Sequence, residues 1–337
     1  MSRLDALREF SPQPLRGDEL RRLLTKIALR QGKIMREVGR LYGPKQLPRY
    51  RNIPNSREVF HSQNGIYTAT HLFDSGGVAD VFLAYGQGST QPVIVKKLKA
   101  EHFRKPGFKE RFIKEAEIQA KYKHKNILSP IDTCFNGADY FIVFPFIRGL
   151  SLADFVIELA NEGGKLTASE AVTIVLLISG VLVALEDKGI LHRDLKFDNF
   201  MLAPDEGRII LLDFGLAKET VGLTNLSLSA ETFVNLDYLA PELVLSSSAV
   251  PNIQSEIFAL GITLIKMFNP LLVRFKTEEE FVSWLQNPIV KISDDIPRSL
   301  CPLLEAMVAC NPQQRFWSFR QVNVVCQHLL LKYADRG

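Results

Sequence analysis

Two short stretches decide the fold: His-Arg-Asp-Leu-Lys-Phe-Asp-Asn at residues 192–199, and Leu-Leu-Asp-Phe-Gly at residues 211–215. Apolar and β-branched residues at 208–212 are typical of a strand, and the sequence Ala-Pro-Asp-Glu-Gly at 203–207 is typical of a turn. Together these features predict a hairpin that joins the two stretches.

Such a hairpin would place Asn199 beside Asp213, which gives two oxygen donors suited to a hard cation such as Mg²⁺. Asp194 would lie nearby, as a carboxylate able to orient and deprotonate a hydroxyl group. Each residue alone is common in loops as a turn former or helix cap. Only the ordered set points to catalysis.

That ordered set resembles the catalytic loop and metal-binding motif of the eukaryotic-type (Hanks-type) serine/threonine protein kinase family. The resemblance implies an α+β fold of two lobes: a small antiparallel β lobe of about five strands with one regulatory helix, and a larger helical lobe. It covers residues 66–332, with the small lobe expected at 66–147 and the helical lobe at 148–332. Residues 1–60 would add an N-terminal helical extension and a linker.

A glycine-rich loop is expected at residues 74–84, because backbone that approaches phosphate closely must carry no bulky side chain. The match is partial. Gly76 holds the central glycine position and Gly77 follows it, whereas Asp74 and Ala79 replace the outer two glycines and Val78 takes the usual aromatic place.

Lys96 ends the apolar strand Val-Ile-Val-Lys at 93–96, and a lysine on a buried strand is rarely structural unless it is paired. The resemblance implies that Lys96 holds the α and β phosphates of ATP and pairs with a carboxylate on the regulatory helix. Glu115 is the expected partner. Glu117 is the alternative, although two residues along a helix it would lie on a different face.

The hinge between the lobes is expected after the strand at 140–144, with adenine bound by backbone groups of Phe146 and Ile147. Phe144 falls on the gatekeeper position, which would close the pocket behind the adenine. Pro145 lacks an N–H group and cannot donate a hydrogen bond there.

An activation segment is expected from Asp213 to Glu242, with Arg193 as the receptor for a phosphate on it. The sequence Tyr-Leu-Ala-Pro-Glu at 238–242 closes this segment in the family, and Arg315 stands where the family pairs an arginine with that glutamate. The segment carries five candidate hydroxyls: Thr220, Thr224, Ser227, Ser229 and Thr232. Besides the glycine-rich loop, two residues depart from the family pattern: Asn235 replaces a threonine, and Glu256 replaces an aspartate that opens the central helix.

The resemblance implies an enzyme that transfers the ATP γ-phosphate to a protein hydroxyl, with ATP and Mg²⁺ bound and Asp194 as the base. Lys196 stands where Ser/Thr kinases place a lysine, so Ser/Thr specificity is expected. The alternative is a pseudokinase that binds nucleotide or acts as a scaffold, supported by the altered glycine loop and the two departures. A third interpretation, a small-molecule kinase, fits the complete motifs less well.

Composition indicates a globular, cytoplasmic protein. The four cysteines form no Cys-x-x-Cys pair and no metal-ligand spacing, as expected of reduced residues. The N-terminus lacks the apolar stretch of a secretory signal. The longest apolar run, at 171–185, is too short to span a bilayer and indicates a buried helix. No integral membrane segment and no specific nucleic-acid signal are therefore expected.

Residues 1–60 carry fourteen Lys/Arg and six Asp/Glu, a balance of +8 in a chain of net charge +4. Gly17 and Asp18 predict the start of an amphipathic helix and Gly43-Pro44 its end. Its expected apolar face consists of Leu20, Leu24, Ile27, Gln31, Ile34, Val38 and Leu41. The favoured interpretation is a helix packed on the back of a lobe. The alternative is a basic docking helix for a protein partner, an anionic membrane surface or nucleic acid. A linker is expected at 44–54.

Overall fold

A computed structural model of the chain describes residues 17–42, 51–52, 58–103, 105–137, 139–214, 236–246, 248–272, 274–275 and 277–333. Contacts within the chain divide it into two units. The larger unit contains the described parts of residues 1–41, 150–209 and 218–337, and the smaller unit those of 42–149 and 210–217. Each unit is described by itself.

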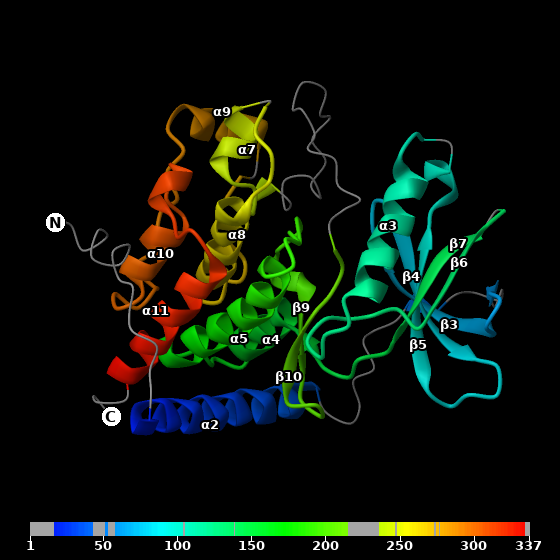
Figure 1. The fold of residues 1–337 in the computed structure, drawn as a ribbon, viewed down its shortest axis with the longest axis horizontal. Helices are drawn as coiled ribbons and strands as arrows, with labels where there is room; N and C mark the ends of the chain where they lie inside the picture. The colour runs from blue at the N-terminus through cyan, green and yellow to red at the C-terminus, as the bar shows by residue number, and fades with distance from the viewer. Residues whose placement is uncertain are drawn as a thin grey trace. The chain divides into compact units, whose positions relative to one another are not determined.

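The smaller unit is built on an antiparallel sheet in the order β1-β3-β4-β5-β7-β6, with β2 also paired with β3 (Figure 1). Its strands are β1 (Arg51–Asn52), β2 (Val59–His61), β3 (Ile66–Ser75), β4 (Ala79–Gly86), β5 (Pro92–Leu98), β6 (Asp132–Asn136) and β7 (Asp139–Pro145). The sheet is accompanied by a 3₁₀ turn, η1 (Ala100–His102), and by helix α3 (Phe108–Lys121).

The expected count of five strands was too low, because β1 and β2 add to the sheet. Both pair with β3, and β1 falls inside the stretch 44–54 that was expected to be a linker. Strands of two and three residues carry no readable alternation of apolar and polar positions, so their sequence gives no strand signal.

Strand β5 shows how the sheet positions a lysine. Val93 and Val95 are buried in the core on one side of the sheet. Because successive side chains on a strand point to opposite faces, Ile94 and Lys96 point to the other side. Ile94 packs there against the cluster that contains Phe112 of α3. Lys96 is therefore directed toward the helix.

The larger unit is mostly helical. Its elements are α2 (Gly17–Tyr42, whose last residue belongs to the smaller unit), β8 (Leu150–Ser151), α4 (Leu152–Asn161), α5 (Ala168–Glu186), η2 (Phe197–Asn199), β9 (Phe200–Ala203), β10 (Arg208–Leu211), α7 (Pro241–Leu245), α8 (Ile253–Lys266), α9 (Glu278–Gln286), α10 (Cys301–Met307), η5 (Pro312–Gln314) and α11 (Phe319–Lys332). Strands β10, β9 and β8 form a small sheet, and the chain leaves this unit within β10, after Ile209. Local capping fixes the main helices: α5 begins with a capping box of Thr167 and Glu170, and α8 with one of Asn252 and Ser255.

Helix α5 passes through the middle of the larger unit. Among the described helices it alone is long and apolar enough to cross a membrane, and 61% of its most apolar window is buried inside the fold. The core helix of a globular unit passes the same test, because a helix buried on all sides is apolar on all sides.

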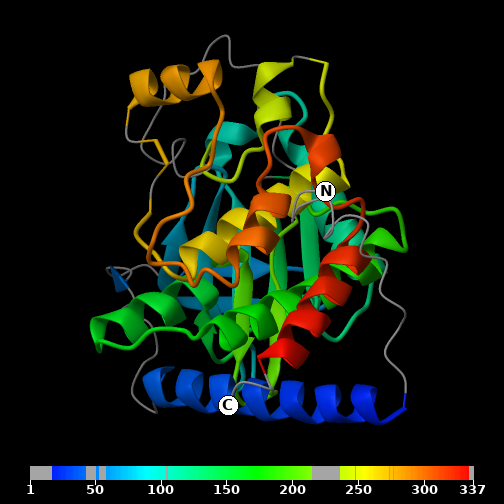
Figure 2. The same cartoon turned by 90° about the vertical axis from the view of Figure 1, so that its left-hand side faces the viewer.

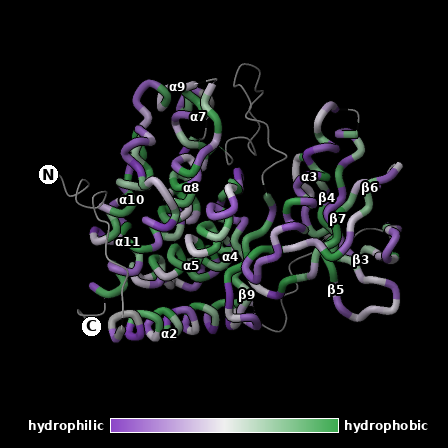
Figure 3. Tube along the Cα trace, in the orientation of Figure 1, coloured by the Kyte–Doolittle hydropathy of each residue, from purple (hydrophilic) through white to green (hydrophobic). Residues whose placement is uncertain are grey.

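Helix α2 lies along the larger unit, next to α4, α5 and the β9–β10 turn (Figures 1 and 2). Hydrophobic and hydrophilic residues alternate along it (Figure 3). Lys33 pairs with Glu170 of α5 at 2.6 Å, and Arg40 pairs with Glu162 beyond the end of α4. These contacts agree with the favoured interpretation of a helix packed on the back of a lobe.

The expected apolar face of α2 was partly wrong. Ile34, Val38 and Leu41 are buried as expected, but Leu24 is 55% exposed and Leu23 is buried in its place. The expected apolar residues repeat every 3.5 residues, whereas a straight α-helix has 3.6 residues per turn. The row of expected residues therefore drifts away from the buried face along the helix. The side chain of Leu20 lies outside the described residues.

Candidate active site

In the larger unit the catalytic loop folds back on Asp194. The 3₁₀ turn η2 returns the chain so that the amide nitrogen of Asn199 donates to the backbone carbonyl of Asp194 at 2.8 Å and to its Oδ2 at 3.1 Å. The ammonium of Lys196 lies 3.7 Å from the same Oδ2. One carboxylate is thus held by an amide and an ammonium group.

Two buried side chains of the larger unit accept hydrogen bonds from the backbone of this loop. Glu256 of α8, one of the departures from the family pattern, is buried and accepts the backbone N–H of Arg193 at 2.5 Å. The hydroxyl of Tyr238 accepts the backbone N–H of Phe197 at 3.2 Å. Burial raises the pKa of Glu256 to about 7, despite the backbone N–H groups of Arg193 and His192 that favour its charged form.

In the smaller unit Lys96 joins two carboxylates. Its ammonium lies 2.8 Å from Oε1 of Glu115 and 3.1 Å from Oδ2 of Asp213. Glu115 is buried on α3, whereas Glu117 is exposed, so the structure brings together the favoured pair and not the alternative.

These charges act on the protonation of Lys96. Burial alone lowers the pKa of a lysine, but the carboxylates of Asp213 and Glu115 together outweigh it and raise the pKa of Lys96 above its ordinary value. Lys96 is therefore a cation held between two carboxylates.

The glycine-rich loop connects β3 to β4, and the backbone N–H of Gly76 donates to the carbonyl of Ala79 at 3.1 Å. Phe144 is buried on β7, which pairs with β5, and the gatekeeper position expected for it is consistent with this burial. Phe146 and Ile147 follow directly after β7 and are half-buried. Their binding of adenine stays a prediction.

The donor chemistry at Asn199 and Asp213 fits a hard cation. The amide nitrogen of Asn199 is used in its bonds to Asp194, which directs its oxygen elsewhere. Asp213 pairs with Lys96 through Oδ2, and its side chain is 43% exposed. Both remaining oxygens are of the type that Mg²⁺ prefers. Because the two residues belong to different units, their expected proximity stays a prediction.

Arg315 and Glu242 form the pair expected from their motifs. Two nitrogens of the fully buried guanidinium each lie 2.7 Å from an oxygen of Glu242. The five candidate hydroxyls and Asn235 lie outside the described residues.

A buried ionic cluster next to Tyr238 was not predicted. Asp237 accepts from Lys266 at 2.8 Å and from the backbone N–H of Arg274 at 2.7 Å, and the ammonium of Lys266 lies 5.0 Å above the ring of Tyr238. The one sequence signal was Lys266 itself, a charged residue that follows the mostly apolar stretch 257–265 at the end of α8. Such a lysine must be paired to be buried.

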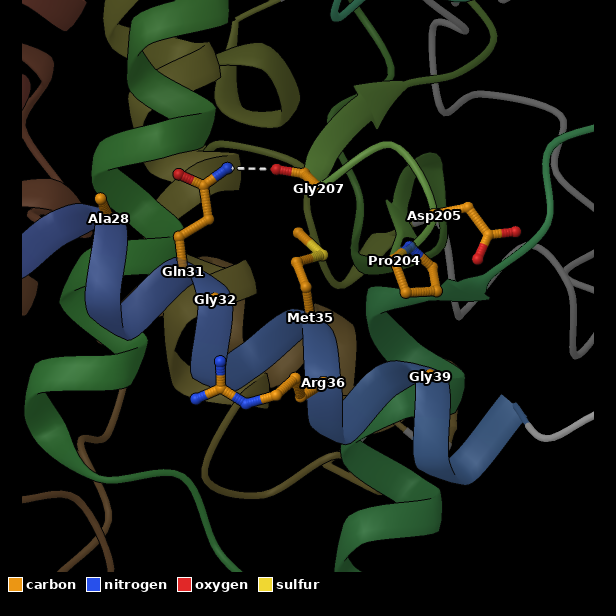
Figure 4. Close-up of a pocket in the computed structure, with 9 residues that line it drawn as sticks. All are labelled: Ala28, Gln31, Gly32, Met35, Arg36, Gly39, Pro204, Asp205 and Gly207. Atoms are coloured by element: carbon orange, nitrogen blue, oxygen red, sulfur yellow. Dashed lines mark hydrogen bonds between the residues drawn. The ribbon is translucent and has the colours of Figure 1, made fainter.

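A pocket of about 600 Å³ lies in the larger unit between α2 and the β9–β10 turn, and Asp194 is not among the residues that line it (Figure 4). Gln31 points into it and donates to the carbonyl of Gly207, and Gly39 faces the ring of Pro204 (Figure 4). The N-terminal helix thus contacts the turn of the hairpin that follows the catalytic loop.

Comparisons with known proteins show which family and which fold the chain resembles. The sequence profile of a family described as "Protein kinase domain" matches residues 67–329. The serine/threonine-protein kinase PknD of Chlamydia muridarum is 27% identical over 293 residues, which cover 77% of this chain and 31% of that protein. The serine/threonine-protein kinase PksC of Streptomyces coelicolor is 28% identical over 280 residues, which cover 78% of this chain and 48% of that protein.

The chain therefore spans less than half the length of these curated relatives. Among solved structures, the kinase domain of PknI from Mycobacterium tuberculosis matches with a TM-score of 0.59 and 23% identity, over 78% of this chain and 95% of that one. At this identity the likeness shows the fold.

Proposed function

The chain belongs to the protein kinase family, and from that membership we propose that it transfers the γ-phosphate of ATP to Ser or Thr hydroxyls of protein substrates. One observation carries the proposal: the carboxylate of Asp194 is held by both Asn199 and Lys196. An ordered carboxylate at this position is what removal of a proton from an acceptor hydroxyl requires.

Asp194 acts on the acceptor hydroxyl. With its Oδ2 fixed by Lys196 and Asn199, the carboxylate can accept a hydrogen bond from the hydroxyl of a substrate and take its proton during the transfer. The ammonium of Lys196 then stands next to the transferred group and offsets its negative charge. Because Ser/Thr kinases of the family place a lysine at this position, we assign Ser/Thr specificity.

Lys96 acts on the nucleotide. Its pairing with Glu115 and Asp213 keeps it charged and fixed, so that it binds the α and β phosphates without a large loss of side-chain entropy. Asn199 and Asp213 would hold Mg²⁺, which supplies positive charge to the phosphates when it is bound.

The alternative is a pseudokinase. Its support is the incomplete glycine loop, with Asp74 and Ala79 in glycine positions, and the departures at Asn235 and Glu256. Glu256 nevertheless holds the backbone of Arg193, so this departure does not detach the catalytic loop.

Incubation with γ-labelled ATP, Mg²⁺ and a mixed Ser/Thr and Tyr peptide library tests the proposal. We expect phosphate on Ser or Thr from the wild type and about a hundredfold less or lower still from Asp194→Asn, a nearly isosteric control that cannot accept the proton. If both proteins bind ATP equally and neither transfers phosphate, the pseudokinase is the correct assignment. Label confined to tyrosine would contradict the assignment of Lys196.

For helix α2 we propose a role within the molecule. Two of its basic side chains, Lys33 and Arg40, are paired with acidic residues of the larger unit. Arg22 and Arg36 are exposed and remain candidates for the alternative, a protein or anionic surface. Sedimentation with vesicles of anionic lipid distinguishes packing within the molecule from binding to an anionic surface. Binding of the wild type that is abolished in the double variant Arg22→Gln/Arg36→Gln would support the anionic surface.

A further inference from the structure

His102 is buried next to the glycine-rich loop, although no motif predicted a role for it. It ends the 3₁₀ turn η1, which follows strand β5, and its side chain is buried with the residue 5% exposed. Its Nε2 lies 2.8 Å from the backbone carbonyl oxygen of Gly77. A side chain distant in sequence thus contacts the middle of the loop.

The chemistry of this contact fixes the direction of the hydrogen bond. A carbonyl oxygen can only accept, so Nε2 must carry the proton and donate it to Gly77. Among the described residues the other ring nitrogen, Nδ1, has no hydrogen-bond partner. Nε2 also lies 3.3 Å from Oε1 of Glu101, an exposed carboxylate that likewise can only accept. The bond to Gly77, at 2.8 Å, is the shorter of the two polar contacts of the buried imidazole.

The plane of the imidazole is set by an aromatic neighbour. The rings of His102 and Phe108 stack with their centroids 4.6 Å apart and their planes 16° apart. Phe108 is the first residue of α3, the helix that carries Glu115 about two turns later. His102 thus bridges the glycine-rich loop and the start of the helix that pairs with Lys96.

Other bonds fix the same loop from nearby positions. The backbone N–H of Lys99, just before η1, donates to the carbonyl of Val78 at 3.0 Å. Ser75 donates to Asp80 at 2.6 Å across the base of the loop, and Lys99 lies 3.6 Å from the same carboxylate. The loop that lacks two of the family's glycines is held by side chains and by the segment at 99–102.

We propose that His102 is a positioning residue for the phosphate-binding loop. By donating to Gly77 while stacked on Phe108, it holds the loop in the conformation that receives the nucleotide phosphates. The inference rests on the proposed function, because it assumes that this loop binds ATP. Loss of the donor would let the loop sample other conformations, and nucleotide binding would then have to order it again.

The test separates the donor from the stacking ring. His102→Phe keeps an aromatic ring on Phe108 but cannot donate, and His102→Gln restores an N–H that can reach the carbonyl of Gly77. His61→Phe serves as a matched control, since His61 is exposed on β2 of the same unit. Thermal unfolding of each variant verifies that the fold persists.

Two measurements are made on all four proteins. The first is hydrogen–deuterium exchange of the peptide over residues 74–80 without nucleotide, and the second is the Kd for ADP by calorimetry. For His102→Phe we expect exchange and Kd to rise about five- to tenfold, the cost of one hydrogen bond of ordinary strength. His102→Gln and His61→Phe should stay within about twofold of the wild type. In steady-state assays the KM for ATP should rise while kcat changes little.

Wild-type loop exchange in His102→Phe would overturn the inference, as would a His102→Gln variant as defective as His102→Phe. Neither readout requires phosphate transfer. If the wild type binds ADP but transfers no phosphate, the proposed function fails while the exchange data still decide the role of His102.

Discussion

The carboxylate of Glu256 accepts the backbone N–H of Arg193, the residue that precedes Asp194. Arg193 has a φ of 66°, and it is the only non-glycine residue with positive φ in the described part of the chain. This left-handed conformation costs a non-glycine residue about 1–2 kcal/mol. The bond from α8 stabilises that conformation and thereby sets the direction in which Asp194 leaves the backbone.

Replacement of Glu256 by glutamine should change how stability depends on pH. The pKa of Glu256 is raised from 4.5 to about 7 by burial, so the folded protein holds a proton there that the unfolded chain releases. The free energy of unfolding of the wild type should therefore fall relative to Glu256→Gln as pH rises from about 4.5 to 7, by on the order of 3 kcal/mol. Urea unfolding at several pH values measures the difference. Parallel pH curves for the two proteins would contradict it.

Removal of the partner of Lys96 should weaken the use of ATP. Glu115→Gln takes away one of the two carboxylates that fix Lys96, and we expect kcat/KM for ATP to fall about tenfold or more, as for loss of a hydrogen bond between charged groups. Glu117→Gln, two residues along the same helix but exposed, should behave as the wild type. Equal losses of kcat/KM in both variants would show that the total negative charge of α3 matters and that the ion pair between Lys96 and Glu115 does not.

Asp194→Asn should lower kcat by roughly 10²–10⁴ and leave the Kd for ADP unchanged, because a positioned base is lost while the nucleotide contacts remain.

Asn199→Ala is predicted to change the response to Mg²⁺. If Asn199 holds the metal, the Mg²⁺ concentration needed for half-maximal activity should rise. A variant that responds to Mg²⁺ as the wild type does would rule out Asn199 as a ligand.

The corrected face of α2 predicts opposite outcomes for two apolar residues on one helix. Ile34 is 3% exposed, and Ile34→Ala should lower the free energy of unfolding by about 2–4 kcal/mol. Leu24 is 55% exposed, and Leu24→Ala should change it by no more than about 0.5 kcal/mol. Urea unfolding of both variants decides, and a reversed order would restore the face expected from the sequence.

Phosphorylation of the activation segment should raise activity, with Thr232 or Ser229 as the expected acceptor. Both lie outside the described residues, but Arg193, their expected receptor, is exposed beside the catalytic loop. A phosphate there would supply nearly two negative charges to the guanidinium. Phosphatase treatment before a first-turnover assay is the measurement. Undiminished activity of the dephosphorylated protein would contradict the switch and favour the rival view, that Asn235 and Glu256 order the segment without phosphate.

The sequence predicted best where chemistry restricts a residue to one role. Lys96 on a buried strand needs a carboxylate, and the resemblance to the regulatory helix favoured Glu115, with Glu117 on a different face of that helix. It predicted less well where position depends on distant packing. The geometry of a straight helix placed Leu23 inside instead of Leu24, and the two-residue strand β1 depends on β3 for its partner.

Residues that act through a single distant contact left no signal. His102 is one histidine in a polar turn, and only the fold brings it to Gly77. The hydroxyl of Tyr238 is similar: its motif is readable, but its bond to Phe197 is not. A sequence shows which groups require a partner more clearly than it shows which groups serve as one.

The contact between α2 and the β9–β10 turn has a practical consequence for anyone who shortens this protein. A fragment that began at residue 67, where similarity to other kinases begins, would lose the buried side chains of Leu23, Ile34, Met35, Val38 and Leu41. It would also leave Glu170 without Lys33 and expose to water a surface that the helix covers. Poor solubility of such a fragment would then reflect where the cut was made and would say nothing about the stability of the uncut chain.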